Sequence, residues 1–226
     1  VTGKMIYTNE NGSTIGDGCS AYMKYENWLR AHETRVGSIV GVDGGIDAVR
    51  RGLYTPMNAD QLPDFILPLR VAEQGFRVVF EPEALLKEPA LNEVQDEHRM
   101  RVRVTLRALW ALYDMRHLLS IRRYGLFAFQ LWSHKVLRYL CFIFLAGALV
   151  SNAALWNEHF VFKVCLAGQV FGYAGSAISQ ILEKMGRRVR ILFLLRYFVL
   201  VNSSAAAGFF RFLRGHKQVM WTPRKG

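Results

Sequence analysis

Cysteine is scarce in this chain, and the few cysteines form no recognisable framework. Three occur among 226 residues: Cys141 and Cys165 inside apolar segments, and Cys19 in the mixed N-terminal part. Their spacing matches neither a metal site nor a disulfide set. The pattern argues against a disulfide-stabilised secreted domain and is consistent with a part that faces a reducing cytosol.

Acidic residues are also few, because 18 Asp and Glu oppose 29 Lys and Arg and leave a formal net charge of +11. A basic balance of this size can indicate nucleic-acid binding, yet no aromatic-basic RNA motif or helix-turn-helix pattern accompanies it. Basic residues instead flank long apolar segments, where such residues contact lipid head groups or set membrane topology. The sequence therefore predicts a lipid bilayer as a partner, and no nucleic acid.

The sequence has neither an initiator methionine nor a signal peptide at its start, and it opens on a strand-like run, VTGKMIYTN. We therefore expect the chain to be part of a longer protein. Its composition changes along its length: residues 1–115 are mixed in character, and apolar segments separated by basic patches follow. A mixed part of this size suits one domain.

Three long segments have few charged side chains and predict membrane-embedded helices. They are residues 139–156, 160–178 and 191–210. Arg196 lies inside the third segment, where its charge would have to snorkel or face protein. Because the flanking basic patches should all face the cytosol, we expect two full spans. The third segment would then be re-entrant or interfacial, with its break at 202–204.

The segment 125–138 interleaves apolar with polar side chains and is too polar to span a membrane. It predicts an interfacial helix with Trp132 at the depth of the lipid head groups. The alternative is a helix that packs against protein alone.

The N-terminal part alternates strand and helix patterns. We expect strands at 1–8, 37–41 and 77–80, helices at 21–30, 66–74 and 90–115, and turns or loops at 9–18, 42–45, 58–63 and 81–83. Gly75 suits the C-terminal end of the second helix.

Two local features of this part can carry chemistry. Asp64 lies where the second helix begins, so it is either a helix N-cap or a general base that faces a cleft. The other feature is the turn formed by Asp43, Gly44 and Gly45. Adjacent glycines permit positive φ angles and close approach of a ligand. The alternative is a tight turn in which Asp43 hydrogen-bonds its own backbone.

Several motifs occur in a fixed order along the chain. The longest are VGSIVGVDGGIDAVRR at 36–51 and DFILPLRVAEQGFRVVFEPEA at 64–84. YMKYENWLR lies upstream, and an arginine-rich stretch at 99–107, SHKVLRYL and WTPR lie downstream. Taken together, they resemble the C-terminal half of a family 2 membrane glycosyltransferase with the GT-A fold. This group contains the exopolysaccharide, poly-N-acetylglucosamine, hyaluronan and cellulose synthases.

The resemblance implies an α/β fold, in which a partial GT-A (Rossmann-like) glycosyltransferase domain precedes interfacial and transmembrane α-helices. The implied parts are the acceptor side of the catalytic domain at 1–115, amphipathic interfacial helices at 116–138, a transmembrane helical region at 139–213 and a basic cytosolic tail at 214–226. It also implies an integral membrane protein whose catalytic part faces the cytosol, as at a bacterial inner membrane.

The implied reaction moves a sugar, with inversion, from a UDP-linked nucleotide-sugar donor to a saccharide or lipid-linked acceptor. Asp64 would be the catalytic general base and Arg103 would bind the diphosphate. Trp28 would lie on a helix that borders the acceptor cleft. The acceptor-binding turn would consist of Asp43, Gly44 and Gly45.

The family holds a divalent metal, Mg or Mn, with an Asp-x-Asp pair. No such pair occurs in this chain. We therefore expect a preceding part of the full-length protein to hold the metal, and we assign no metal ligand here.

The sequence departs from the family at three positions. Pro63 stands where a second acidic residue usually precedes the base, and the missing like charge predicts a lower pKa for Asp64. Met100 and Val104 replace the Gln and Trp of the family's Gln-x-x-Arg-Trp motif, which favours an enzyme that is not processive or that holds its acceptor differently.

Three alternatives stay open. Arg99, Arg101 and Arg103 could form a solvated or lipid-facing basic surface and not a diphosphate site. The chain could be a catalytically inactive membrane subunit of a polysaccharide-synthesis complex. It could also be part of a transporter or channel, although the alternating strands and helices of the N-terminal part disfavour this.

Overall fold

The computed structural model describes residues 1–8, 14–89, 94–187 and 189–219. The described part is mostly helical, with one parallel pair of strands, β1 (Thr2–Thr8) and β2 (Phe80–Pro89). The helices are α1 (Thr14–Val36), α2 (Pro63–Glu73), α3 (Val94–Asp114), α4 (Ile121–Leu131), α5 (Leu137–Tyr139), α6 (Cys141–Ala154), α7 (Phe160–Lys184) and α8 (Arg190–Leu213). Two short 3₁₀ helices, η1 (Arg51–Leu53) and η2 (Arg116–Leu119), and a π-helical turn, η3 (Trp132–Val136), complete the set. The described residues mix strands with helices, but they do not form a GT-A sheet.

The strand pair confirms the first expected strand and corrects the others. β2 begins only at Phe80, so most of the segment predicted as a strand at 77–80 precedes it, and β2 continues through the turn expected at 81–83. Thr2 pairs with Phe80 and Lys4 with Leu85, so the ladder bulges in this part of β2. A bulge tolerates Pro82, which has no N–H for a ladder bond.

The expected strand at 37–41 is an irregular segment, with bends at 37 and 40, and belongs to no ladder. Ile39 and Val40 are buried, as a core strand would require. The Ile39 N–H donates to the Val78 carbonyl at 3.0 Å, but the hydroxyl of Ser38 accepts the Val78 N–H, also at 3.0 Å. A side chain has thus taken the place of a backbone partner, which explains why regular pairing stops here.

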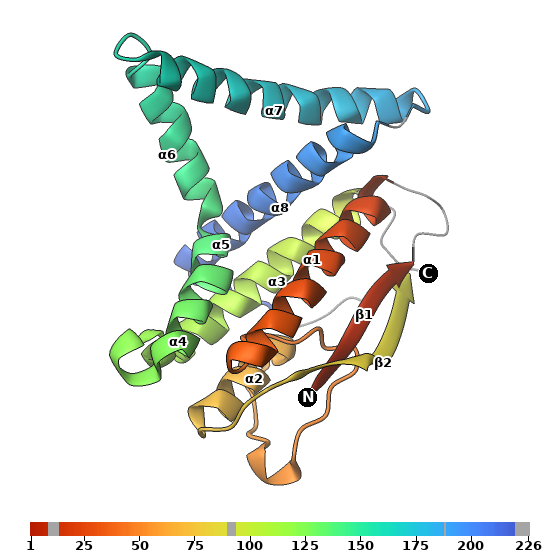
Figure 1. The fold of residues 1–226 in the computed structure, drawn as a ribbon, viewed down its shortest axis with the longest axis vertical. Helices are drawn as coiled ribbons and strands as arrows, with labels where there is room; N and C mark the ends of the chain where they lie inside the picture. Colours follow the sequence, from red (N-terminus) through yellow and green to blue (C-terminus); the bar gives the residue numbers. More distant parts are fainter. Residues whose placement is uncertain (9–13, 90–93, 188, 220–226) are drawn as a thin grey trace.

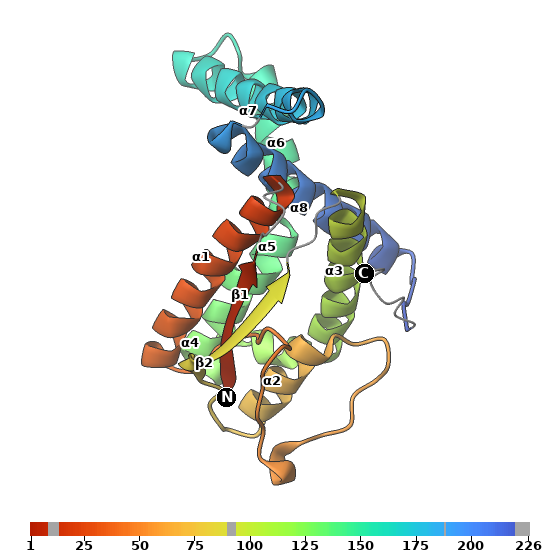
Figure 2. The same ribbon diagram turned by 90° about the vertical axis from the view of Figure 1, so that its right-hand side faces the viewer.

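The N-terminal helices form where the apolar periodicity predicts them, with different ends. α1 is longer than expected and begins at Thr14, so the C-terminal half of the loop predicted at 9–18 is helical; residues 9–13 lie outside the described part. α2 begins at Pro63, and Gly75 just beyond its end has a φ of 81°. α3 occupies the helix expected at 90–115, of which 90–93 lie outside the described part. α1 packs along β1 (Figures 1 and 2).

The main hydrophobic core lies between α2, α3 and α4. Its fully buried members include Ile66, Leu69, Leu118 and Leu131. α4 therefore packs on the N-terminal part of the protein, while Phe129 on its other face remains 58% exposed. Trp132 donates to the Leu119 carbonyl at 3.1 Å. The amphipathic segment thus packs one face against protein, as the alternative required, and exposes apolar side chains such as Phe129 on another. Its interfacial location stays a prediction.

The C-terminal helices include two candidate membrane spans. α7 and α8 are the two described helices that are long and apolar enough to cross one. α6 has 14 residues, about 21 Å, which is shorter than a bilayer core; it joins the preceding helical segment at a bend of 62°. Figure 1 shows α6, α7 and α8 as three sides of a triangle, and in Figure 2 α6 and α7 again lie apart from the strands.

The expected break in α8 at 202–204 does not occur. The helix is continuous, because the side chains of Asn202 and Ser204 donate within the helix to the carbonyls of Phe198 and Leu200, at 2.9 and 2.7 Å. Arg196 forms an ion pair with Glu183 of α7. Of the two expected arrangements, snorkelling or facing protein, its charge therefore adopts the second. α8 also packs along α3 and joins the two parts of the molecule (Figure 1).

Candidate functional site: a cleft between the strands, α3 and the membrane helices

A cleft of about 490 Å³ lies at the centre of the molecule. β1, α1, the turn at 41–45, the start of α2, α3, the segment 135–139 and α8 all contribute to its lining. Every residue that the sequence analysis assigned to the site lies on this cleft: Asp43, Gly44, Gly45, Asp64 and Arg103. The fold therefore brings together residues that are up to 60 positions apart in sequence.

Asp64 occupies the first turn of α2, next to Pro63, whose fixed φ suits a helix start. The N-cap residue is Leu62, and no side chain caps the helix. The N-cap interpretation of Asp64 is therefore wrong. Its backbone carbonyl accepts the Val42 N–H at 3.0 Å, which ties the glycine turn to α2.

The pKa of Asp64 is raised from 3.8 to about 6. Burial is the main cause, and the charges of Asp47 and Asp43 add to it, while Arg107 opposes. The lower pKa expected from Pro63 is therefore wrong. Pro63 removes the negative charge next to Asp64 in sequence, but Asp43 and Asp47 lie close enough in the fold to raise the pKa of Asp64.

The glycine turn closes directly on the Asp64 carboxyl group. Gly44 has a φ of 76°, and a Cβ built on it would lie 2.2 Å from the Asp64 Cγ. No side chain fits at this position, because both the backbone angle and the contact exclude it. Gly45 also lines the cleft and packs its Cα side against Leu86 of β2.

Asp43 does not hydrogen-bond its own turn, so the tight-turn alternative is not observed. One carboxylate oxygen lies 2.5 Å from an Arg30 nitrogen, and both side chains are about 95% buried. Burial raises the pKa of Asp43, although Arg30 opposes this. The other oxygen, Oδ2, is buried without a hydrogen-bond partner among the described residues. Asp43 thus shapes the turn through Arg30.

Three of the four arginines of α3, at positions 99, 101 and 103, have different surroundings. Arg103 lines the cleft, as expected of a residue that binds an anion. Arg101 also reaches the lining, but its guanidinium is held by Glu97 at 2.6 Å and by Tyr197 of α8. Arg99 is 74% exposed and forms a surface ion pair with Asp96. The basic-surface alternative therefore applies to Arg99, and Arg101 joins α3 to α8.

Met100 and Val104, which replace the family's Gln and Trp, both line the cleft. Trp28 does not: it is 57% exposed and stacks on Tyr25 along the outside of α1, with ring centroids 6.2 Å apart. The helix that carries Trp28, α1, borders the cleft as the resemblance implies, but Trp28 itself is not among the lining residues.

Arg107 is a site residue that the sequence analysis missed. It donates to the carbonyls of Ala59 and Gln61, in the loop that leads into α2, and its charge lowers the pKa of Asp64. Its partners are backbone carbonyls, which carry no signal in the sequence. Its place one helical turn after Arg103 was the only hint that it faces the same region.

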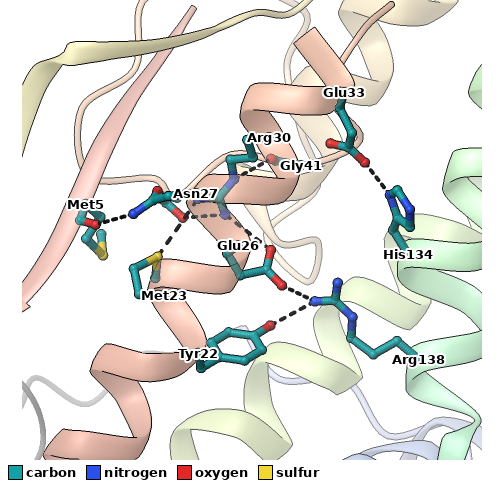
Figure 3. Close-up of polar contacts among 11 residues, drawn as sticks. Met5, Tyr22, Met23, Glu26, Asn27, Arg30, Glu33, Gly41, His134 and Arg138 are labelled. Atoms are coloured by element: carbon teal, nitrogen blue, oxygen red, sulfur yellow. Dashed lines mark hydrogen bonds and ion pairs between the residues drawn. The ribbon is translucent and has the colours of Figure 1, made fainter. Parts of the chain in front are cut away.

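The opposite wall of the cleft is a buried charge network between α1 and the segment 134–138 (Figure 3). Arg138 donates to Glu26 and to the Tyr22 hydroxyl, the latter at 2.9 Å. Glu33 pairs with His134 in the same way. Burial alone would raise the pKa of Glu26, but the positive charges of Lys135, Arg138 and Arg30 outweigh it and lower the value to about 2. Before the fold was known, the motif SHKVLRYL was the one sign in the sequence that this segment matters.

The residues present do not fit a metal site. Among the described residues, no group of three or more His, Cys, Asp or Glu could hold an ion. Asp43 is already paired with Arg30, Arg103 adds positive charge to the cleft lining, and the charge of Arg107 acts on Asp64. No step of the chemistry below is assigned to a metal.

Comparisons of this chain with protein-family models, with curated proteins and with solved structures each gave no match.

Proposed function

We propose that this chain carries the acceptor side of a membrane-bound, inverting glycosyltransferase. The donor would be a UDP-linked sugar, and the acceptor a saccharide or a lipid-linked sugar. The observation that carries the proposal is Asp64, a carboxyl group with a pKa of about 6 on the wall of a 490 Å³ cleft. Perturbed carboxyl groups in clefts are typical of catalytic acids and bases.

Asp64 would act as the general base. An ordinary aspartate, with a pKa near 3.9, is a weak base, whereas a value near 6 leaves the group mostly ionised at pH 7 and better able to accept a proton. An acceptor hydroxyl that enters the cleft would lose its proton to Asp64 as it attacks the anomeric carbon. Attack on the face opposite the leaving diphosphate inverts that centre.

Positive charge on the cleft wall would stabilise the departing diphosphate. Arg103 lines the cleft together with Met100 and Val104 of the same helix. The Gln and Trp that the family places here are absent. Because Arg103 is retained, we expect the contact with the diphosphate to be kept. The absence of the Gln and Trp would instead change how the acceptor is held.

The wall of the cleft also supports a membrane location for the reaction. Val201 and Ala205 of α8 contribute to the lining, and α8 is one of the two helices long and apolar enough to cross a membrane. A substrate in this cleft would therefore lie beside the bilayer. In the proposal the N-terminal part faces the cytosol, where nucleotide-sugars are made.

The proposal is tested by replacing the base in the complete protein, purified in detergent. Asp64→Asn should lower UDP release from a UDP-sugar donor by about 10²- to 10⁴-fold, because no group remains to take the proton. The wild-type rate should fall about tenfold per pH unit below pH 6, where Asp64 becomes protonated.

Asp96→Asn is the matched control, because Asp96 is an exposed carboxylate on α3 and lies away from the cleft. It should leave UDP release unchanged. Activity of Asp64→Asn within threefold of wild type would refute the base. A wild-type protein that releases no UDP from any sugar donor would leave the inactive-subunit alternative standing.

A further inference from the structure

The segment from Trp132 to Tyr139 contributes side chains to the cleft that the proposed reaction does not use. It begins with the π-helical turn η3, and such turns occur frequently at functional sites. The segment directs His134 and Arg138 onto α1 (Figure 3). Lys135 lies between them in sequence and lines the cleft.

The carboxylates around Lys135 already have other partners. Glu26 is held by Arg138 and Arg30. Glu33 is held by His134, and Asp43 is held by Arg30. Among the described residues, none of these carboxylates forms an ion pair with Lys135.

The ammonium group of Lys135 has apolar contacts instead. It lies 5.6 Å from the centre of the Phe65 ring and beside Gly41, where a Cβ would come within 2.9 Å of the nitrogen. Burial lowers the pKa of Lys135 to about 8, although Glu26 opposes this. The residue thus places a cation, with donors to spare, on the wall of a cleft.

We propose that Lys135 binds a phosphate group of a ligand in this cleft. An ammonium group is a compact point charge that suits phosphate, and a doubly charged anion gains more than a carboxylate from the nearby Arg103. Two sources carry this chemistry: a water-soluble compound such as a nucleoside diphosphate, or a lipid phosphate whose tail lies along α8. The inference concerns binding alone and does not depend on the transfer reaction.

The test is calorimetric titration of the complete protein, in a nonionic detergent, with sodium pyrophosphate and with dodecyl phosphate. At least one probe should bind saturably. Lys135→Met keeps the length of the side chain but removes its charge, and it should weaken that binding about tenfold or more. Lys135→Arg should retain the affinity to within about threefold, because the charge stays.

Two further variants test whether phosphate binding depends on the position of the Lys135 charge or only on the total positive charge of the protein. Arg99→Gln removes an exposed positive charge from α3 and should leave binding unchanged. Gly41→Ala keeps every charge but places a methyl group against the Lys135 ammonium, which must move. It should weaken binding less than Lys135→Met does, because the ammonium keeps its charge and lies at the end of a flexible side chain. Lys135→Met must also remain folded, because the Lys135 charge contributes to the lowered pKa of Glu26; a cooperative thermal transition in the same detergent checks this.

Each outcome decides the proposal. Lys135-dependent binding of pyrophosphate assigns the site to a water-soluble phosphate, and Lys135-dependent binding of dodecyl phosphate alone assigns it to a lipid phosphate. Binding of neither probe, or equal binding by the wild type and a folded Lys135→Met, would overturn it. Asp64→Asn should keep phosphate binding, so failure of the base and failure of this inference are distinguishable.

Discussion

The two walls of the cleft use carboxylates in opposite ways. On the wall made by α1 and 134–138, Glu26 and Asp43 of the adjoining turn each pair with an arginine, and Glu33 lies against the His134 ring. On the other wall, Asp64 has two further aspartates as its electrostatic neighbours and one arginine. Burial pushes both kinds of carboxyl group toward the neutral form, so the neighbours decide the outcome.

As a consequence, two acidic groups of one cleft have very different pKa values. Glu26, among three cations, has a pKa of about 2, and Asp64 has a pKa of about 6. A paired carboxylate holds elements together, whereas an ionisable group that faces a hollow without a partner is available for chemistry. The neighbouring charges, and not the type of acidic residue, therefore decide whether a carboxyl group in this cleft stabilises the fold or is available for chemistry.

The largest expected effect is on the paired wall. Glu26→Gln would leave Arg138, Arg30 and Lys135 buried around a neutral amide, so we expect a loss of about 3–5 kcal/mol in the free energy of unfolding. The depressed pKa means that this stabilisation is present above pH 4.5 and is lost as the pH falls toward 2. Chemical denaturation in detergent at pH 7.5 measures it.

Asp96→Asn serves as the control for an exposed pair and should cost less than about 1 kcal/mol. Equal losses in the free energy of unfolding for Glu26→Gln and Asp96→Asn would mean that the buried pairs of this wall stabilise the fold no more than an exposed pair does. The contrast between the two walls would then fail.

The next effect has the opposite sign and concerns the unpaired wall. Asp64 has a folded pKa of about 6, above its ordinary 3.8, so ionisation destabilises the folded state as pH rises from about 4 to 6. Asp64→Asn should therefore stabilise the protein by up to about 3 kcal/mol at pH 7.5 and have almost no effect at pH 4. Denaturation midpoints of both proteins at the two pH values measure this. A loss of about 1 kcal/mol at pH 7.5 would instead restore the capping role.

The unpaired wall was largely predictable from sequence. Adjacent glycines indicated the turn, and apolar periodicity indicated a helix at 66–74 with Asp64 where it begins, close to the observed start of α2 at Pro63. Arg103 was assigned from the resemblance. Their meeting in one cleft was expected from the resemblance alone. The pKa of Asp64 was not predictable, because Asp43 and Asp47 act through the folded turn and not as sequence neighbours.

The paired wall could not be read from the sequence. Glu26 and Arg138 are 112 positions apart, and nothing local indicates that two such distant charges will meet. The same limit explains two errors in the fold. Ser38 was counted as part of a strand, yet its hydroxyl took a backbone N–H. Asn202 looked like a helix break, yet the helix satisfies its side chain internally.

The smallest expected effect on stability tests how the unpaired wall is positioned. Gly44→Ala would force a side chain into a left-handed backbone angle, at about 1–2 kcal/mol, and would also drive the Asp64 carboxyl group away from the turn. Gly75→Ala is the matched control: its φ of 81° imposes the same strain, but nothing lies within 4 Å of the added carbon. Gly44→Ala should lose at least as much stability as Gly75→Ala, because the contact with Asp64 adds to the backbone cost that the two share. Only Gly44→Ala should lower UDP release, by at least about tenfold, since small displacements of a base are costly. Equal UDP release by the two variants would show that the turn does not hold Asp64 in its working position.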